Sequence, residues 1–379
     1  MAAGKTTEKK DRVAAESETK LDVRIIFLCL FAIPLVAGVS LLVTEGGKVS
    51  GEESMSAADG GSKPRLNGLT LEAPRRQVGP DWVQHFKQVN ANWVAIVPYA
   101  FCGNNQHVHY ARRGQKVHGG WWGESPVGVR TTIQHAKSQG LKVMLKPQIW
   151  FRGIWAGQFQ LQTSAHWQSW EQDYDAYIDT MLQIAREEQV ELFCLGTELR
   201  HSFNLRPDYW RGLIRRVRAV YDGKLTIAAN WDNYHNVRFW SDLDYIGIDA
   251  YFPLTREAHP GVETLWAKWF PICNKLERFS RRHGRPILFT EYGYRSLPQT
   301  TWNNWEKEHQ YHYPVDLEAQ ATALTAMYQC FWPKDWFAGG FLWKYRLPHN
   351  VVGGPEDNNY TPQNKPAEEI VRTAYQNFP

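Results

Sequence analysis

Two glutamates stand out in this sequence because each follows an apolar run and a threonine. Glu198 ends the stretch VELFCLGTE, and Glu291 ends the stretch PILFTE. Such runs are typical of buried parallel strands, so we expect both carboxylates at the C-terminal ends of strands. Glycosidic bond cleavage needs two carboxyl groups, one to donate a proton and one to attack the anomeric carbon or activate a water. The pattern predicts that Glu198 and Glu291 form such a catalytic pair.

Polar and aromatic residues also end the other apolar runs. If those runs are barrel strands, these residues lie at the end of the barrel where active sites form. We therefore predict a set of substrate-binding residues that comprises Lys146, Gln148, Trp150, Thr197, Asn230, Trp231, Asp249, Tyr251, Tyr292 and Trp343. For several of them, Asn230 and Asp249 included, packing or the orientation of a neighbour is an equal alternative.

Alternating apolar runs and amphipathic stretches supply the elements that would position these residues. Strands are expected at 66–73, 93–101, 141–150, 190–197, 224–231, 245–252, 286–292 and 337–343. Helices are expected at 81–90, 130–139, 169–188, 207–221, 263–283, 316–331 and 366–377, with a short segment through Trp240 after the fifth strand. This order predicts an α/β fold, a (β/α)8 TIM barrel. A doubly wound sheet is the alternative, but no glycine-rich phosphate loop follows the first strand.

The N-terminal part of the chain differs from the rest in composition. Residues 1–24 are polar and charged, and we expect a disordered cytoplasmic tail there. Residues 25–43 carry no charged side chain. The length of this run is close to the minimum for a transmembrane helix. Basic residues concentrate before this run, so the domain after it should face the periplasm or the extracellular space. We favour an uncleaved anchor over a cleaved signal peptide, which would give a secreted protein. Residues 44–64 form a flexible linker, and 65–379 the catalytic domain.

The composition narrows the class of ligand. Aromatic residues make up 14% of the 379 residues, including 18 Trp, and flat rings suit sugar faces, although core packing explains many of them. The net charge of +4 is small, and no basic cluster interleaves with aromatics as nucleic-acid binding would need. The five cysteines have no zinc-site spacing and are expected as buried thiols. We expect no metal, no cofactor and no obligate protein partner.

Several of these stretches resemble a known family. Strands that end in Glu198, Glu291 and Trp343 resemble the clan A glycoside hydrolases, and LKVMLKPQIW, LFCLGTEL, YIGIDAYFPL, ILFTEYGYRS and GGFLWKY are similar to glycoside hydrolase family 113, the β-mannanases. The likeness covers most of 65–379. It implies a retaining mechanism with Glu198 as acid/base and Glu291 as nucleophile. It also implies that Trp343 lies under the sugar that is cut and that Tyr251 holds the nucleophile.

One residue departs from the clan pattern. Most members carry Asn directly before the acid/base, where this chain has Thr197. The usual hydrogen bond to the sugar 2-hydroxyl would then be lost or remade, which is compatible with the axial 2-hydroxyl of mannose. The resemblance to the β-mannanases, and not this residue, implies that the substrate is a β-1,4-mannan or mannooligosaccharide. A β-glucan- or xylan-active enzyme, an exo-acting mannosidase and a non-catalytic carbohydrate-binding envelope protein remain alternatives.

Overall fold

The computed structural model describes residues 64–103, 107–110, 120–302, 305 and 314–379. The predicted tail and anchor, and all of the predicted linker but its last residue, lie outside this part of the chain. Within the described part, no helix combines the length and apolar character that crossing a bilayer requires. The transmembrane segment at 25–43 therefore stays a prediction.

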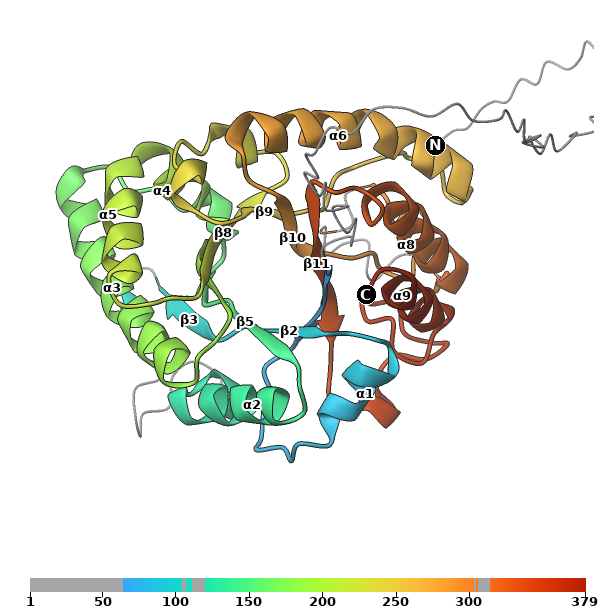
Figure 1. The fold of residues 1–379 in the computed structure, drawn as a ribbon, viewed down its shortest axis with the longest axis horizontal. Coiled ribbons are helices and arrows are strands. Elements are labelled where there is room, and N and C mark those ends of the chain that lie inside the picture. The colour runs from blue at the N-terminus through green and yellow to red at the C-terminus, as the bar shows by residue number, and fades with distance from the viewer. Residues whose placement is uncertain (1–63, 104–106, 111–119, 303–304, 306–313) are drawn as a thin grey trace, which may run out of the picture. The chain divides into compact units, whose positions relative to one another are not determined.

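Eight parallel strands close into a barrel, which confirms the predicted (β/α)8 architecture (Figure 1). Around the barrel, neighbouring strands follow the order β1-β11-β10-β9-β8-β7-β5-β2. Their bounds are β1 Leu66–Leu71, β2 Trp93–Ile96, β5 Lys142–Leu145, β7 Leu192–Thr197, β8 Lys224–Asn230, β9 Ile246–Asp249, β10 Ile287–Tyr292 and β11 Phe337–Tyr345. The carboxyl ends of all eight strands consequently lie at one end of the barrel.

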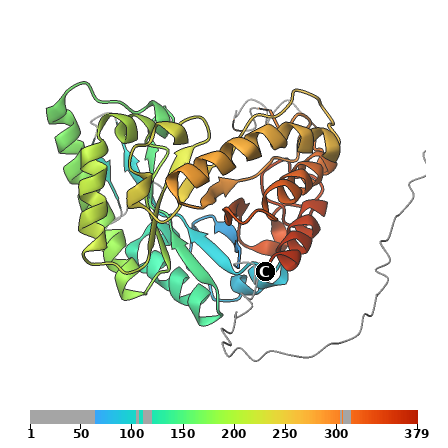
Figure 2. The same ribbon diagram turned by 45° about the horizontal axis from the view of Figure 1, so that its top comes forward.

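Helices pack around the outside of the barrel (Figures 1 and 2). They are α1 Trp82–Gln88, α2 Pro126–Ser138, α3 Ser164–Glu187, α4 Arg200–Leu205, α5 Pro207–Arg218, α6 Val262–His283, α8 Leu317–Phe331 and α9 Pro366–Asn377. Between β8 and β9 the chain makes only two 3-10 turns, Tyr234–Asn236 and Trp240–Asp242, in agreement with the predicted short segment.

Local sequence signals explain where several helices begin and end. The hydroxyl of Ser125 accepts the backbone N–H of Gly128 at 3.1 Å, and Pro126 occupies the first helical position of α2. At the other end of α6, Gly284 adopts a left-handed conformation with φ of 61°, as expected for a residue that ends a helix. These boundaries follow from the side chains at the helix ends.

The core has two layers. Side chains that point into the barrel form a compact apolar cluster that includes Trp93, Met144 and Phe341. A much larger cluster fills the space between the strands and the helices. At Gly68, an added Cβ would lie only 2.3 Å from the ring of Phe341, so only glycine leaves room for that ring inside the barrel. The four described cysteines, Cys102, Cys194, Cys273 and Cys330, are buried free thiols, as expected.

The second and third predicted strands were each wrong in one respect, because both are broken. The barrel strands end at Ile96 and Leu145, and the chain continues into β3 (Tyr99–Cys102) and β6 (Gln148–Phe151). These pair with each other and with β4 (Val108–His109) in a separate three-stranded sheet. Pro98 and Pro147 lie at the two breaks, where a residue without a backbone N–H cannot continue a ladder.

Candidate active site

The two glutamates lie at the same end of the barrel. Glu198 directly follows β7, and its backbone N–H donates to the carbonyl of Ala228 on β8 at 2.8 Å. Its φ of 55° falls in the left-handed region, which is unusual for a residue with a side chain and is often found at functional sites. Glu291 lies near the end of β10, level with Asp249 on β9. Both carboxylates are thus presented by the carboxyl ends of strands.

Three donors surround the carboxylate of Glu291. Its Oε1 accepts from the ammonium group of Lys146 and, at 2.8 Å, from the amide of Gln148. Its Oε2 accepts from the hydroxyl of Tyr251 at 3.0 Å. The side chain is nearly buried, with 7% of the residue exposed. Hydrogen bonds of this kind stabilise a negative charge and fix the carboxylate in one orientation.

A buried ion pair between Lys146 and Asp249 adjoins the carboxylate of Glu291. Lys146 is fully buried and lies 3.2 Å from Oδ1 of Asp249, which also accepts from the hydroxyl of Thr290 at 2.8 Å. Burial and the charge of Glu291 raise the pKa of Asp249 to about 7, against the opposing charge of Lys146. Burial opposes the charge on Lys146, but Asp249 and Glu291 together raise the pKa of its ammonium group. Lys146 therefore stays protonated between these two carboxyl groups.

The surroundings of Glu198 are different. Among the described residues its carboxylate has one side-chain donor, the indole N–H of Trp155. Burial, and next the negative charges of Asp249 and Glu291, raise the pKa of Glu198 to about 8. The hydrogen bond from Trp155 lowers this pKa but does not offset the other contributions. Near neutral pH Glu198 is mainly protonated and able to donate.

The negative charges of the two glutamates act on each other and on shared neighbouring groups. The charge of Glu291 contributes to the raised pKa of Glu198. Burial, followed by both glutamates, raises the pKa of Tyr99. Burial likewise raises the pKa of Tyr360, the charge of Arg295 lowers it, and both glutamates raise it further. Glu198 and Glu291 therefore lie at the same end of the barrel and within range of each other's charge, and their role as a catalytic pair stays a prediction.

Trp155 is itself held in place by a short chain of contacts. The guanidinium of Arg200 lies 4.9 Å from the Trp155 ring centre, in a cation–π arrangement. Arg200 forms an ion pair with Asp232, which accepts a 2.9 Å hydrogen bond from the amide of Asn230. Asn230, predicted to bind substrate, is connected in this structure to Trp155 through Asp232 and Arg200.

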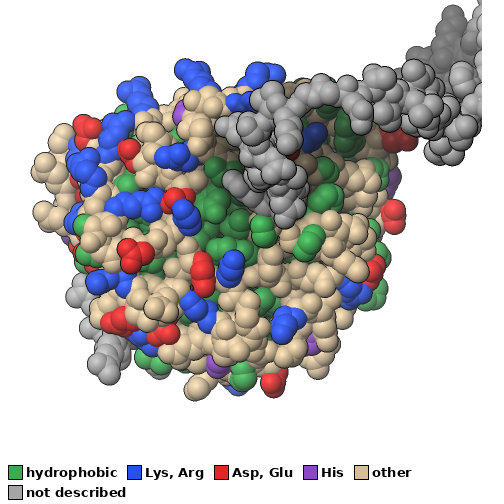
Figure 3. All heavy atoms as spheres, in the orientation of Figure 1, with side chains coloured by type: hydrophobic (Ala, Val, Ile, Leu, Met, Phe, Trp, Pro, Cys, Tyr) green, Lys and Arg blue, Asp and Glu red, His purple; other side chains and the backbone are tan. Residues whose placement is uncertain are grey.

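Several predicted aromatic residues surround this end of the barrel. Trp343 on β11 is half-buried and packs on the apolar cluster inside the barrel. Trp231 lies with its ring centre 5.9 Å from that of Trp305. Trp150 is 44% exposed and stacks on Phe101 at 5.5 Å. Figure 3 shows apolar side chains gathered over the middle of the barrel, with acidic and basic side chains around them.

Two predicted substrate contacts need comment. Tyr292 does not reach the site: it is fully buried, and its hydroxyl bonds to those of Tyr328 and Tyr375 at 2.9 and 2.8 Å. This corrects the prediction, because successive residues of a strand face opposite sides and Tyr292 faces the helices when Glu291 faces the site. Thr197 is buried directly before Glu198, and its hydroxyl has no hydrogen-bond partner in the described part of the chain.

Sequence reasoning missed three residues that adjoin the glutamates. Trp155 and Tyr360 lie in long connections, where the position of a strand end gives no guide. Tyr99 lies in β3, beyond the break at Pro98, and so was treated as the interior of a strand. Pro98 could have indicated that the barrel strand ends before Tyr99. In the described part of the chain, no group of three or more His, Cys, Asp or Glu residues is arranged to hold a metal ion.

Comparison with known families agrees with this geometry. The sequence model of the family described as Glycoside Hydrolase Family 113 matches residues 76–365 of this chain. The chain belongs to glycoside hydrolase family 113. This family 113 chain is therefore a glycoside hydrolase, as the resemblance implied. No curated protein sequence matches it.

Solved structures share the fold of this family 113 chain. The family 113 β-mannanase of Alicyclobacillus acidocaldarius has 24% sequence identity and a TM-score of 0.70, over 83% of this chain and 98% of that chain. A second family 113 β-1,4-mannanase has 22% identity and a TM-score of 0.69, over 83% and 99%. A β-glucuronidase of Faecalibacterium prausnitzii has 16% identity and a TM-score of 0.56, over 84% of this chain and 50% of that chain. At these identities the likeness shows the barrel fold alone.

Proposed function

We propose that this chain hydrolyses β-1,4-mannosidic bonds in mannan or mannooligosaccharides with retention of the anomeric configuration. The observation that carries the proposal is the contrast between the two glutamates. Glu291 accepts from three donors, among them a buried ammonium group, whereas burial and neighbouring carboxylates raise the pKa of Glu198 to about 8. An ionised nucleophile beside a protonated acid is the arrangement that a retaining glycosidase uses. The family and the β-mannanases of similar fold support the choice of mannan.

In the first step, an oxygen of Glu291 attacks the anomeric carbon of the bound sugar. The bond from that carbon to the glycosidic oxygen breaks as Glu198 gives its proton to this oxygen, and the leaving sugar departs. Lys146, Gln148 and Tyr251 hold Glu291 in a fixed orientation, so little reorganisation is needed on attack. The product is a glycosyl-enzyme and an ionised Glu198.

In the second step, Glu198 accepts a proton from a water that attacks the same carbon, which releases Glu291. Esterification has removed the negative charge of Glu291, one of the contributions that raise the pKa of Glu198. Glu198 is therefore a weaker base in the glycosyl-enzyme than its free-enzyme pKa would suggest, and it holds its negative charge until the water arrives. Water attack restores both side chains to their starting protonation states.

Substrate positioning is assigned to the residues around this pair. Trp343 offers a half-buried ring as the floor for the sugar that is cut, and Tyr251 holds the nucleophile. The buried hydroxyl of Thr197 lies at the position where the clan usually has Asn, and we assign it to the sugar 2-hydroxyl. Lys146 and Asp249 act through Glu291, because Lys146 donates to Glu291 and is itself paired with Asp249.

The decisive experiment is hydrolysis of defined mannooligosaccharides followed by NMR of the first product. We expect the β anomer to form first, and mannan to be cleaved in preference to β-glucan and xylan. Formation of the α anomer would refute the retaining mechanism. Preference for glucan or xylan would refute the choice of sugar, and mannan binding without products would favour a non-catalytic binding protein.

The N-terminal segment leads to a separate proposal about location. We infer that residues 25–43 anchor the chain as a single membrane span, with residues 1–24 in the cytoplasm and the barrel outside. The length of the uncharged run and the basic residues before it support this. The full-length chain should stay in the membrane pellet after alkaline carbonate washing and be released by detergent. Recovery of a shortened, soluble chain would instead support a cleaved signal peptide.

A further inference from the structure

A guanidinium group lies one aromatic ring away from Tyr251, which donates to Glu291, and has no part in the mechanism above. Arg295 belongs to the segment after β10, and its guanidinium carbon is 4.9 Å from the ring centre of Tyr360. The Tyr360 ring is in turn 6.1 Å from the ring of Tyr251, which donates to Glu291. One aromatic ring therefore separates this cation from the residues that hold the nucleophile.

Arg295 is buried with only part of its hydrogen-bonding capacity met, by a hydrogen bond to the side chain of Tyr360. Only 7% of the residue is exposed, and in the part of the chain that the structure describes neither Nε nor Nη1 has a hydrogen-bond partner. A guanidinium group has only donors, and buried donors on a charged group are costly when they stay unpaired. A ligand that brings acceptor oxygens to this position would remove that cost.

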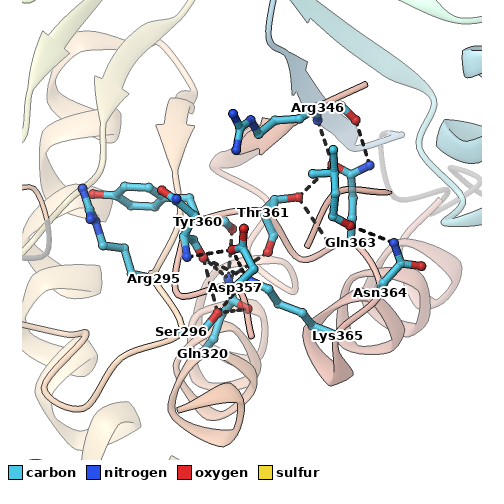
Figure 4. A network of polar contacts seen from close by, with 12 residues as sticks. Arg295, Ser296, Gln320, Arg346, Asp357, Tyr360, Thr361, Gln363, Asn364 and Lys365 are labelled. Carbon is cyan, nitrogen blue, oxygen red and sulfur yellow. Dashed lines mark hydrogen bonds and ion pairs between the residues drawn. The ribbon is translucent and has the colours of Figure 1, made fainter. Parts of the chain in front are cut away.

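A dense network keeps Arg295 and Tyr360 in this arrangement (Figure 4). The amide of Gln320 donates to the carbonyl of Tyr360 at 2.9 Å. The ammonium group of Lys365 donates to the hydroxyl of Ser296, the residue after Arg295, at 2.8 Å.

The same lysine also ties down the segment that carries Tyr360. Its side chain is fully buried and forms a 2.8 Å ion pair with Asp357. The segment after β10 and the segment after β11 are thus joined through one buried ammonium group. Because both are fixed, the guanidinium is held for a ligand instead of being free to turn toward other partners.

We propose that Arg295 binds an acceptor oxygen of the sugar held at Glu291 and so determines which substituents the site accepts. The inference rests on the proposed glycosidase function and adds a specificity residue to it. The acceptor is a hydroxyl oxygen of a neutral sugar or the carboxylate of an acidic sugar, since both offer the lone pairs that a guanidinium needs.

The test compares Arg295→Met with a matched control, Arg281→Met. Arg281 lies at the surface in the last turn of α6, where it pairs with Glu277. Both variants and wild type are assayed on neutral mannooligosaccharides and on the same oligosaccharides with a carboxylate at C6. We expect Arg295→Met to lower kcat/KM by roughly 10- to 100-fold on the substrate that it recognises. Arg281→Met should stay within about twofold of wild type.

The outcomes separate the two sources of the oxygen. A loss on the neutral substrate assigns a hydroxyl, and a loss confined to the acidic substrate assigns a carboxylate. The thermal midpoint of Arg295→Met should stay close to that of wild type, because the loss of the contact with Tyr360 is offset by the removal of unpaired buried donors. Unchanged kcat/KM on both substrates, or a loss that only follows a lowered thermal midpoint, would overturn the proposal. Wild-type protein that hydrolyses neither substrate would refute the proposed function and the Arg295 assignment with it.

Discussion

The ends of β7 and β10 carry the same residue type in very different surroundings. Glu291 lies among an ammonium group, an amide and a phenol, all of which donate to it. Glu198 accepts from one indole donor, and burial, followed by the negative charges of two other carboxyl groups, raises its pKa. The strands deliver both side chains in the same way, so the different roles that we propose for them come from the groups that surround each carboxylate.

The contrast also shows how one buried cation can serve two carboxylates. Lys146 lies between Asp249 and Glu291 and forms an ion pair with a carboxylate oxygen of each. Glu198 makes no hydrogen bond to this ammonium group among the described residues, although the charge of Lys146 lowers its pKa somewhat. The two glutamates thus differ in that only Glu291 contacts Lys146, whereas burial, followed by the charges of Asp249 and Glu291, raises the pKa of Glu198.

The largest effect is expected for Glu291→Ala. The variant lacks the attacking oxygen, so turnover of mannooligosaccharides should fall by roughly 10⁴-fold or more. Circular dichroism checks that the barrel remains folded. Near-wild-type turnover in a folded variant would remove Glu291 from the mechanism.

Glu198→Ala should have a smaller effect that depends on the leaving group. We expect a loss of about 10²- to 10⁴-fold on mannooligosaccharides, whose leaving sugar needs a proton. The release of an activated phenol needs none, so a burst of phenol should persist with an aryl mannoside. Added azide should then restore turnover by attacking the glycosyl-enzyme in place of water. Equal losses on both substrates, without azide rescue, would contradict an acid/base role.

Lys146→Met tests the cation that separates the two environments. It leaves Asp249 and Glu291 buried without their counter-ion, and we expect a loss of about 3–5 kcal/mol in the free energy of unfolding, measured by denaturation. The control is Lys224→Met, because the exposed pair of Lys224 and Asp244 should contribute less than about 1 kcal/mol. The double variant Lys146→Met/Asp249→Asn should recover part of the loss. No recovery would mean that the ammonium group does not act through Asp249.

The smallest effect concerns the pH dependence of kcat/KM. A raised pKa keeps Glu198 protonated below it, so activity should be lost as the pH rises through about 8. Trp155→Phe removes a hydrogen bond that favours the ionised form, which should move this alkaline midpoint upward by about 0.7 pH unit. A midpoint that stays in place, or moves to lower pH, would show that Trp155 does not set the protonation of Glu198.

The sequence predicted the barrel and the position of Glu198 and Glu291 at the carboxyl ends of its strands, because both depend on local patterns. An apolar run that ends in Thr-Glu indicates a strand and a strand-end carboxylate without knowledge of any distant contact. The strand-end pattern also placed four further residues at this end of the barrel, where the structure connects them with Glu291: Lys146, Gln148, Asp249 and Tyr251. It could not show that Lys146 and Asp249 are buried partners of each other, because that depends on the register of strands far apart in the chain.

The errors have equally specific causes. Tyr292 was placed at the site because it follows Glu291, but neighbouring strand residues face opposite ways. Trp155, Tyr360 and Arg295 were missed because they lie in connecting segments whose course is fixed by tertiary hydrogen bonds such as those of Gln320 and Lys365. No periodic pattern marks such segments.

The broken strands at Pro98 and Pro147 have a consequence for attempts to change substrate range. The small sheet of β3, β4 and β6 could be taken for a part that can be exchanged without affecting the barrel, since its hydrogen-bond ladder is separate from that of the barrel. Yet Gln148, the first residue of β6, donates directly to Glu291. Replacing this sheet would also remove the hydrogen bond from Gln148 that orients Glu291. A redesigned sheet therefore has to keep an amide donor at this position if turnover is to be retained.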